Sequence, residues 1–241
     1  MRLAVISDIH ANLEAFEQVL IDIDKSNIDS TVCLGDNIGY GPDPEQVVSM
    51  IKNHNIPSVM GNHELALVEP SYLSLFNPLA RKSLLKTMDL LSEETIHFIS
   101  GLKPFLIRYE CRFVHGFPPD SATLYLFQIP EDELLLTFKR MEEKICFLGH
   151  THRLEIIDFN GQIVSRVPLT KNIIRLDRER QYIVNIGSVG QPRDGNNCAK
   201  YVIWDSSEYN IEIKFIPYNI VSVVDKILSS GFPIEHAIRL L

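Results

Sequence analysis

The sequence predicts an α/β fold, and three patterns lead to that prediction. Apolar runs of strand length alternate with amphipathic helical patterns in the first part of the chain, an order typical of a sheet covered by helices. Short strand patterns separated by turns dominate after residue 152. Residue types that bind metals directly follow five of the apolar runs. Because α/β sheets build their sites where strands end, we expect a functional site at one sheet edge.

Three strands and two helices are expected in the first 60 residues. The apolar runs cover residues 2–7, 30–34 and 56–60. Asn12 is a plausible N-cap for the first helix. The apolar face of that helix consists of Leu13, Phe16, Val19, Leu20 and Ile23. Pro44 begins the second helix, in the first turn that proline favours. This β-α-β-α-β order predicts parallel strands with covering helices.

Residues 65–109 interrupt this alternation with a helical insertion. Asn77 and Pro78 resemble an N-cap followed by a first-turn proline and predict a helix to about residue 91. Ser92 and two glutamates begin another, which ends near Gly101. The insertion lies between the third and fourth ligand blocks. It is either a cap over the site or a packing element.

The rest of the chain is predicted to be mainly strands until two final helices. The strand patterns cover residues 154–159, 162–167, 182–188, 200–205 and 211–216. The first two flank Asn160-Gly161 and form a hairpin pattern. The helical patterns cover residues 218–229 and 233–240. Since the sequence contains no linker or repeat, we expect one domain spanning residues 1–241.

Composition favours a soluble, cytoplasmic protein. The chain is 45% hydrophobic with a mean hydropathy of +0.03, and no apolar run approaches the roughly 20 residues that span a bilayer. The N-terminus reaches an acid at residue 8, so it is interpreted as a strand and not as a secretory signal. Four cysteines lie far apart, as is typical of buried thiols in a reducing compartment. No membrane partner is expected.

The charge argues against nucleic acid as the partner. The net charge is −8 and the pI about 5.5, and no basic run stands out, whereas a protein that binds a duplex needs a basic face. Bound metal ions would neutralise some of the acids and make the site itself cationic. A small phosphate ester or nucleotide therefore remains compatible with this composition.

Five short blocks contain the candidate metal ligands. The blocks are D-x-H, G-D, G-N-H-E, H-G and G-H-T-H. The candidates within them are Asp8, His10, Asp36, Asn62, His115, His150 and His152. Carboxylate, imidazole and amide ligands together suit manganese, iron, zinc or nickel better than calcium. The blocks predict two divalent transition-metal ions, with manganese as the first expectation, and hydrolysis of a phosphate ester.

In this order, the five blocks resemble the calcineurin-like metallophosphoesterase superfamily over residues 8–152. The resemblance implies a four-layer α/β/β/α sandwich, in which helices flank two packed mixed sheets. It assigns one metal ion to Asp8, His10, Asp36 and His152. It assigns the other to Asp36, Asn62, His115 and His150, so that Asp36 bridges the two ions with its two oxygens. Such a centre hydrolyses phosphate esters with metal-activated hydroxide.

His63 is the expected catalytic residue. It directly follows a ligand, and in the family pattern it lies near the metals without binding them. It would donate a hydrogen bond to a phosphate oxygen or protonate the leaving alkoxide. The other histidines outside the blocks, His54, His97 and His236, receive no role.

Two further stretches narrow the resemblance. Residues 35–48, GDNIGYGPDPEQVV, and residues 185–196, NIGSVGQPRDGN, resemble a bacterial branch that includes small phosphodiesterases and diadenosine tetraphosphate hydrolases. Asn37 and Arg193 are the candidate substrate contacts. The second stretch is either an ordinary turn or a loop that offers N–H groups to an anion. Some members that cleave dinucleoside polyphosphates replace the histidine of G-N-H; His63 therefore favours a general phosphodiesterase or phosphomonoesterase.

Other functions stay open at this point. A binding scaffold that lost the chemistry would show substituted ligands, whereas every ligand position here holds a competent residue. A dinucleoside polyphosphate hydrolase is an alternative within the enzyme class. A nuclease is weakened by the acidic balance. A homo-oligomer is also open, because the apolar C-terminal AIRLL could pack within the chain or across a dimer.

Overall fold

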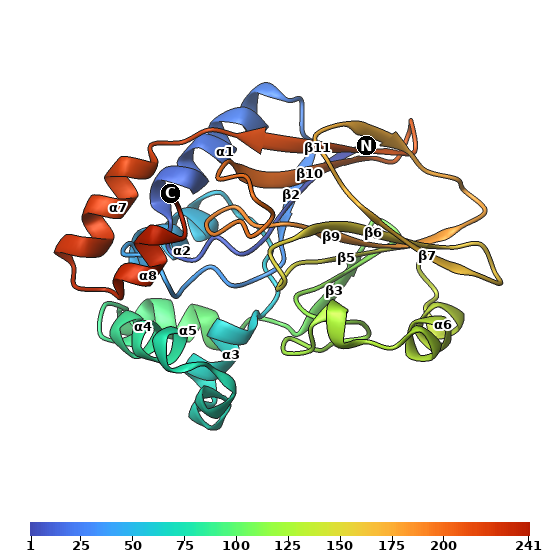
Figure 1. Cartoon of the computed structure of the whole chain (residues 1–241). Helices are drawn as coiled ribbons and strands as arrows, with labels where there is room; N and C mark the ends of the chain where they lie inside the picture. Colours follow the sequence, from blue (N-terminus) through green and yellow to red (C-terminus); the bar gives the residue numbers. More distant parts are fainter.

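Two mixed sheets pack against each other in the computed structural model, which describes residues 1–241 (Figure 1). The first sheet has the strand order β2-β1-β10-β11-β8. Its strands are β1 (Arg2–Ile6), β2 (Ser30–Cys33), β8 (Ile173–Arg175), β10 (Ala199–Asp205) and β11 (Asn210–Ile216). Strands β1 and β2 are parallel, and the other pairings are antiparallel.

The second sheet has the strand order β3-β4-β5-β9-β6-β7. Its strands are β3 (Phe105–Arg108), β4 (Cys111–Val114), β5 (Ile145–Leu148), β6 (Leu154–Phe159), β7 (Val164–Pro168) and β9 (Gln181–Ile186). The three strands β4, β5 and β9 run parallel, while β3, β6 and β7 pair antiparallel. Hairpins from the second half of the chain enter both sheets. The parallel arrangement expected for the first 60 residues is therefore confined to β1 and β2.

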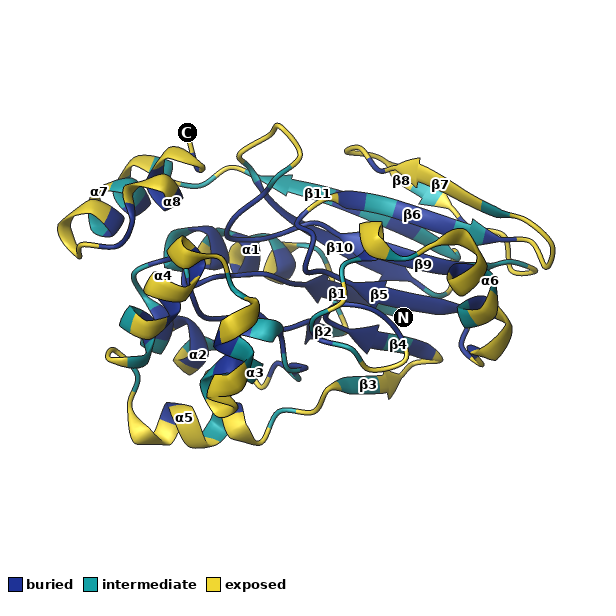
Figure 2. Cartoon of the chain, turned by 60° about the horizontal axis from the view of Figure 1, so that its bottom comes forward, coloured by how far each residue is buried: buried dark blue, intermediate teal, exposed yellow.

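Alternation of side chains along the strands creates the layers. In β1, Leu3 and Val5 enter the apolar cluster between the sheets, whereas Ala4 and Ile6 face the helices on the other side. The covering helices are α1 (Leu13–Lys25) and α2 (Pro44–Asn53) on the first sheet and α6 (Glu131–Arg140) on the second. The result is the predicted four-layer sandwich, with buried strands in its middle (Figure 2).

The predicted helical insertion is present. Its helices are α3 (Asn62–Val68), α4 (Pro78–Met88) and α5 (Glu93–Ser100), with the 3-10 helix η1 (Pro70–Leu75). The Asn77 side chain accepts a hydrogen bond from the Ala80 N–H, and the Ser92 side chain accepts one from the Thr95 N–H. Both therefore act as the predicted N-caps. The end of the insertion is not helical as expected, because residues 105–108 form strand β3, which pairs with β4.

The apolar run at 56–60 forms isolated bridges and no strand. Ser58 bridges Cys33, and Val59 bridges Lys103. Pro57 has no N–H with which to continue a ladder, although its carbonyl accepts a hydrogen bond from the Cys33 N–H. The chain then enters α3 directly, so that the G-N-H-E block lies at the start of a helix.

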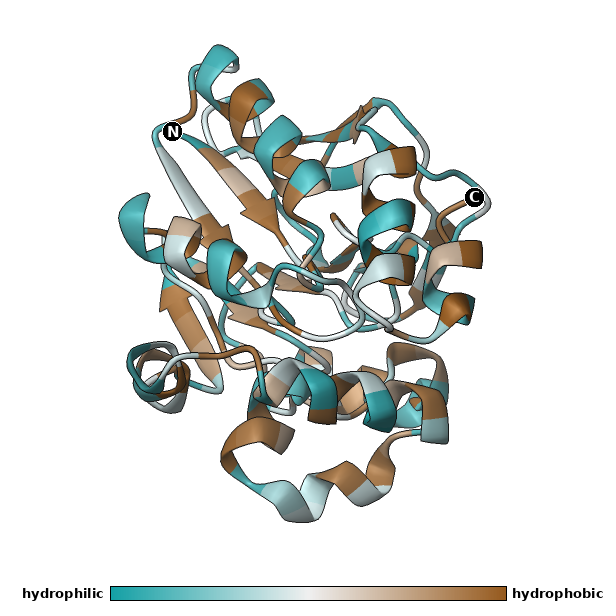
Figure 3. Cartoon of the chain, turned by 90° about the vertical axis from the view of Figure 1, so that its left-hand side faces the viewer, coloured by the Kyte–Doolittle hydropathy of each residue, from teal (hydrophilic) through white to brown (hydrophobic).

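The two predicted C-terminal helices are present as α7 (Ile220–Ser229) and α8 (Ile234–Ile238). Lys226 Nζ lies 3.0 Å from Glu14 and 2.9 Å from Asp43, so α7 is tied to α1 and to the start of α2. Figure 3 views this side of the molecule, where hydrophobic and hydrophilic residues alternate along the helices. None of the helices has the length and apolar composition needed to cross a membrane.

Candidate metal centre

The five ligand blocks converge at one edge of the two sheets. Asp8 and Asp36 follow β1 and β2, His115 and His150 follow β4 and β5, and Asn62 begins α3. All the carboxylates and imidazoles of the set are buried. Donor atoms gather in three groups, each within 4.8 Å: Asp8 with His10 and His152, His10 with Asp36 and His63, and Asp36 with His115 and His150. The fold thus brings the predicted ligands together.

Five of these residues have a left-handed backbone. The angle φ is 54° at Asp8, 50° at His10, 53° at Asp36, 65° at His150 and 59° at His152. Such a conformation costs about 1–3 kcal/mol at a non-glycine residue and persists only where surrounding contacts fix it. Here the N–H of Asp8 donates to the Gly35 carbonyl and that of His10 to the Asp36 carbonyl. Strain concentrated in this way is typical of a functional site.

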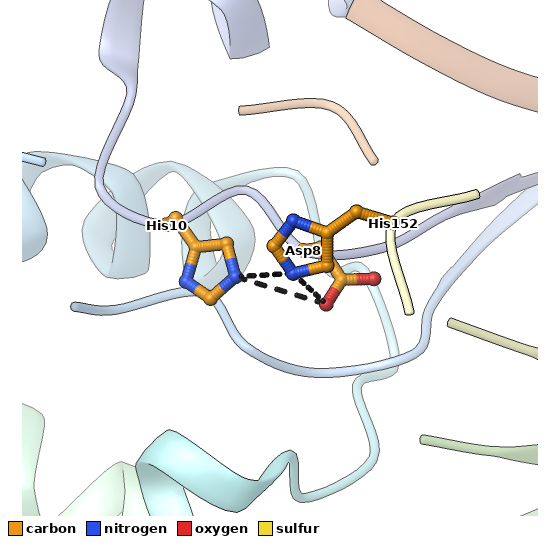
Figure 4. Close-up of side chains that lie close together, drawn as sticks. All are labelled: Asp8, His10 and His152. Carbon is orange, nitrogen blue, oxygen red and sulfur yellow. Dashed lines mark hydrogen bonds and ion pairs between the residues drawn. The ribbon is translucent and has the colours of Figure 1, made fainter. Parts of the chain in front are cut away.

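The first cluster contains Asp8, His10 and His152 (Figure 4). His10 Nδ1 lies 3.1 Å from the Ile38 carbonyl oxygen, and His152 Nδ1 lies 2.6 Å from that of Gln191. Because a carbonyl only accepts, each Nδ1 carries the proton of its ring. Burial, the largest effect on both rings, lowers the pKa of each, so both are neutral. Their Nε2 atoms, 3.0 Å apart, therefore direct lone pairs towards each other.

This arrangement fits a bound cation. Two facing lone pairs repel unless a positive charge lies between them. Two nitrogens that are each about 2.1 Å from one metal ion are about 3 Å apart when they subtend a right angle. Asp8 Oδ1 adds a third donor, because it is buried without a hydrogen bond and lies 3.2 Å from His152 Nε2. Carbonyls on the outer ring nitrogens are the usual support of metal-binding histidines.

The second cluster contains Asp36, Asn62, His115 and His150. His115 Nε2 lies 3.3 Å from Asp36 Oδ2, 3.1 Å from Asn62 Oδ1 and 3.1 Å from His150 Nδ1. Backbone carbonyls again hold the outer nitrogens of both rings. Burial would lower the pKa of His115, but the carboxylates, Asp36 foremost, raise it to about 9. The position favours positive charge, which a metal ion also provides.

Asp36 lies between the two clusters. Its Oδ2 is 3.7 Å from His10 Nε2 and 3.3 Å from His115 Nε2. Its Oδ1 accepts a hydrogen bond of 2.9 Å from the backbone N–H of His63. Burial would raise the pKa of Asp36, but His115 and then His63 hold it well below its usual range. One oxygen of Asp36 therefore faces both clusters, whereas the sequence-based interpretation used both oxygens.

The chain matches a family model over most of its length. Residues 1–208 match the model of the calcineurin-like phosphoesterase superfamily domain. The chain belongs to the calcineurin-like phosphoesterase superfamily. Membership makes it a metal-dependent phosphoric ester hydrolase, and the buried His/Asp clusters agree with that chemistry.

Three similar proteins align with almost the whole length of this phosphoesterase. An uncharacterized protein of Methanocaldococcus jannaschii is 35% identical over 237 residues, 96% of this chain and 93% of that one. The crystal structure of a metallophosphoesterase from Sphaerobacter thermophilus has a TM-score of 0.84 at 32% identity, covering 100% of this chain and 98% of that one. A hypothetical protein from Pyrococcus horikoshii has a TM-score of 0.81 at 18% identity, covering 99% and 97%, and shares the fold.

His63 packs beside the clusters of the phosphoesterase. Its ring lies edge-on to His10, Tyr40 and Phe76, with centroid distances of 4.8, 4.7 and 4.9 Å. Its Nε2 is 3.9 Å from Asp36 Oδ2, and its Nδ1 is buried without a hydrogen-bond partner. Burial is the main reason that its pKa is lowered to about 4. The neutral ring has one N–H to donate.

Glu64, which has no role in the sequence-based interpretation, fixes the Asp36 loop. Its Oε2 accepts hydrogen bonds from the N–H groups of Asp36 and Gly61 at 2.8 and 3.0 Å, and its Oε1 accepts one from Asn37 at 2.7 Å. Burial and then the Asp36 carboxylate raise the pKa of Glu64 to about 7. Position 61 requires glycine, because a Cβ there would collide with Asp36 and with the Glu64 carboxylate.

The Gly-rich loop 185–196 braces the first ligand block. The N–H groups of Val189 and Gly190 donate to the carbonyls of Ser7 and Asp8, and the Ser188 hydroxyl also donates to the Asp8 carbonyl. These N–H groups are engaged within the protein. The geometry therefore argues against the alternative that they cradle an anion.

The two candidate substrate contacts differ in their surroundings. The Arg193 guanidinium carbon is 6.0 Å from the centre of the Tyr40 ring, which in turn lies 4.4 Å from the His10 ring. The Asn37 side chain is buried, donates to Ser58 Oγ and accepts from the Cys33 thiol, both at 3.1 Å. Both ends of the Asn37 amide are thus engaged inside the protein, which argues against substrate binding by Asn37. Arg193 remains close enough to the centre for that role.

A pocket of about 200 Å³ opens beside the second cluster. Asn62 and His150 line its inner side, and Tyr72 and Phe76 from the insertion line another side. The Tyr125 ring stacks on His150 with a centroid distance of 3.8 Å. Part of the insertion therefore lines the pocket beside Asn62 and His150.

His236 and Tyr40 join the C-terminal helices to the site. His236, which has no role in the sequence-based interpretation, is buried, and its Nε2 lies 2.6 Å from Ser83 Oγ on α4. Its ring is 4.8 Å from that of Tyr40. Only the structure reveals this contact, because the three residues come from distant parts of the chain. His54 and His97 are exposed, as expected for histidines without a role.

Proposed function

We propose that this phosphoesterase hydrolyses phosphodiesters or nucleotide-type small phosphate esters at a centre of two divalent metal ions. The main support is the pair of Nε2 lone pairs of His10 and His152 that meet beside an unpartnered oxygen of Asp8. One ion would be held by Asp8, His10, Asp36 and His152. The other would be held by Asp36, Asn62, His115 and His150.

The protein residues contribute positioning and proton transfer. Bound cations would supply Lewis acidity at the phosphoryl oxygens and water of lowered pKa. His63 directs its single N–H at a phosphoryl oxygen or passes the proton to the leaving oxygen, a role worth about 10²–10⁴-fold in rate. Arg193 adds a guanidinium beside the centre, where it contacts phosphate oxygens of the substrate.

The aromatic pocket supports a substrate with an organic group beyond the phosphate. Tyr72, Phe76 and Tyr125 line it next to the ligands Asn62 and His150. Such rings accept a planar base or another apolar group by stacking. A diester or nucleotide fits this surrounding better than inorganic monophosphate.

The metal and the compartment belong to the same proposal. Mixed nitrogen and oxygen ligands are compatible with manganese, iron, zinc or nickel, and manganese is the first to test. A reducing, cytoplasmic compartment agrees with four free cysteines, three of them buried.

The decisive assay compares p-nitrophenyl phosphate with bis(p-nitrophenyl) phosphate, using protein stripped with EDTA and reloaded with manganese. Turnover of the diester that depends on manganese is expected. Absence of turnover for both esters, in protein shown to hold two ions per chain, would contradict the proposal.

Two variants separate metal binding from catalysis. Asp36→Asn should lose metal and activity together, because Asp36 Oδ2 faces both clusters. His63→Ala should keep the metal and lose about 10²–10⁴-fold in turnover. His54→Ala, at an exposed position outside the site, is the matched control and should resemble the wild type. Near-normal turnover of His63→Ala would remove His63 from the mechanism.

A further inference from the structure

A second cavity, of about 500 Å³, adjoins the metal centre through Arg193. Three of its eight lining residues are arginines: Arg153, Arg193 and Arg239. Arg153 follows the ligand His152, Arg193 lies in the loop after β9, and Arg239 ends α8. Three separate parts of the chain therefore bring guanidinium groups to one cavity. The cavity lies close to the metal centre, because the backbone N–H of Arg193 donates a hydrogen bond of 3.2 Å to the backbone carbonyl of His152.

None of these arginines has a carboxylate partner. No side-chain or C-terminal carboxylate lies within 4.0 Å of any of the three. Asp194, next to Arg193 in sequence, lies 2.8 Å from the buried Lys200 instead. Glu235, the acid of α8, also forms no ion pair with them. The cavity therefore carries three positive charges that no ion pair neutralises.

Arg193, which lines the cavity, also contains an unsatisfied donor. Arg193 Nε is buried and has no hydrogen-bond partner, although Nη2 of the same group donates to Gln191 Oε1 at 3.0 Å. A buried donor without a partner costs about 1–3 kcal/mol. Burial, followed by the repulsion from Arg193, lowers the pKa of Arg239, so the two like charges lie close enough to interact. An anion between the two guanidinium groups would offset their repulsion.

We propose that Arg153, Arg193 and Arg239 form a subsite for a second phosphoryl group, so that preferred substrates contain at least two linked phosphoryl groups. This inference rests on the proposed function, which places the first phosphoryl group at the metal centre. Guanidinium groups bind phosphate oxygens through paired hydrogen bonds. The linked phosphates could belong to a nucleoside oligophosphate or to an inorganic oligophosphate, which share this chemistry.

Calorimetric titration of inorganic phosphate and of pyrophosphate tests the subsite. The titrations use metal-free protein and protein loaded with manganese and dialysed free of excess metal. Pyrophosphate should bind the wild type at least about tenfold more tightly than phosphate, since one charge-assisted hydrogen bond contributes about that factor. Arg153→Gln and Arg239→Gln should each reduce this preference several-fold. Arg175→Gln, at an exposed arginine on β8 without an ion pair, is the matched control and should retain it.

The outcomes are distinguishable from those of the proposed function. An equal preference in all four proteins, or an equal loss in Arg175→Gln, would overturn the subsite, whether or not the diester is hydrolysed. Failure of diester turnover would instead contradict the proposed function and leave the binding ratios interpretable. Titration with ADP then identifies the source: tighter binding than pyrophosphate indicates a nucleoside oligophosphate, and equal or weaker binding an inorganic one.

Discussion

Glu64→Gln is expected to loosen the loop that carries Asp36. The carboxylate accepts three backbone hydrogen bonds, two on Oε2 and one on Oε1. Glutamine keeps one acceptor oxygen, and its NH2 group can only face the remaining donor. With the oxygen placed where it accepts two bonds, one buried N–H loses its partner, at a cost of about 1–3 kcal/mol.

Thermal unfolding of the manganese-loaded protein at pH 8 measures this cost. Glu64, with its pKa raised to about 7, is ionised at this pH, and bound cations would offset the penalty of burying its charge. For a chain of this size each kcal/mol shifts Tm by about 2–4 °C, so Glu64→Gln should melt about 2–12 °C below the wild type. Glu64→Ala removes all three acceptors and should fall further. Glu17→Gln, at an exposed position on α1, should leave Tm unchanged.

The same substitution should weaken the metal centre. Asp36 Oδ2 faces both clusters, so a displaced loop affects the ligands of both proposed ions. Substituting a residue that supports a ligand typically costs about 10–100-fold in metal affinity, and excess manganese should restore the loss. If Glu64→Gln melts with the wild type and binds manganese equally well, Glu64 does not hold the loop and the reasoning is refuted.

Three further predictions follow from other contacts. Gly39 has φ of +85°, and a Cβ there would collide with the His63 ring, so Gly39→Ala should keep bound manganese but lose about 100-fold or more in diester turnover; unchanged turnover would show that the ring position is unimportant. Manganese at about 1,000 times its Kd should stabilise the fold by about 4 kcal/mol per site, raising Tm by about 8–16 °C in a titration that EDTA reverses; a Tm insensitive to manganese would count against the centre. Although burial opposes both shifts, hydrogen bonds with Ser222 and Lys226 lower the pKa of Glu14, and those with Asp43 and Glu14 raise the pKa of Lys226. Ionised Glu14 therefore contributes its full share of the folding stability above the unfolded pKa of glutamate, about 4.3. Protonated Lys226 contributes its full share below the unfolded pKa of lysine, about 10.4. The Tm deficit of Lys226→Gln should accordingly be constant between about pH 6 and 9 and shrink below about pH 4; a deficit that persists at low pH would show that the ion pairs with Glu14 and Asp43 do not cause it.

Much of the fold was predictable because its signals are local. Asn12, Asn77 and Ser92 each accept a hydrogen bond from the N–H three residues later, as caps do. Helix α6 was missed although acids fill its first turn and bases its last turn, a pattern that the helix dipole favours. Strand β8 has three residues with little burial and exists through its pairing with β11, so no local pattern could have revealed it.

The clustering of the candidate ligands could be predicted, whereas most of the groups that support them could not. Carboxylates and imidazoles are specific residue types, and their place after apolar runs is visible in one sequence. The groups that orient the imidazoles are backbone carbonyls, such as those of Ile38 and Gln191, and any residue type has a carbonyl. Glu64 lies within the G-N-H-E block, but its acceptance of the Asp36 N–H spans 28 residues and depends on the folded loop. The role of Tyr40 could not be predicted from the sequence, since Tyr40, His10 and His236 come from three separate segments that meet only in the folded chain.

The distribution of charge connects the centre with the arginine cavity. Two divalent cations would outweigh the carboxylates of Asp8 and Asp36, because the remaining proposed ligands are neutral when they bind metal. The centre would then be positive, and three arginines without counterions extend that charge to one side. The chain as a whole carries a net charge of −8, so the positive charge of the centre and the cavity is what favours an anionic substrate. Association of a phosphate-rich substrate should therefore slow as ionic strength rises, and the slope should flatten in Arg239→Gln more than in Arg175→Gln, because only the former removes a charge from this cavity.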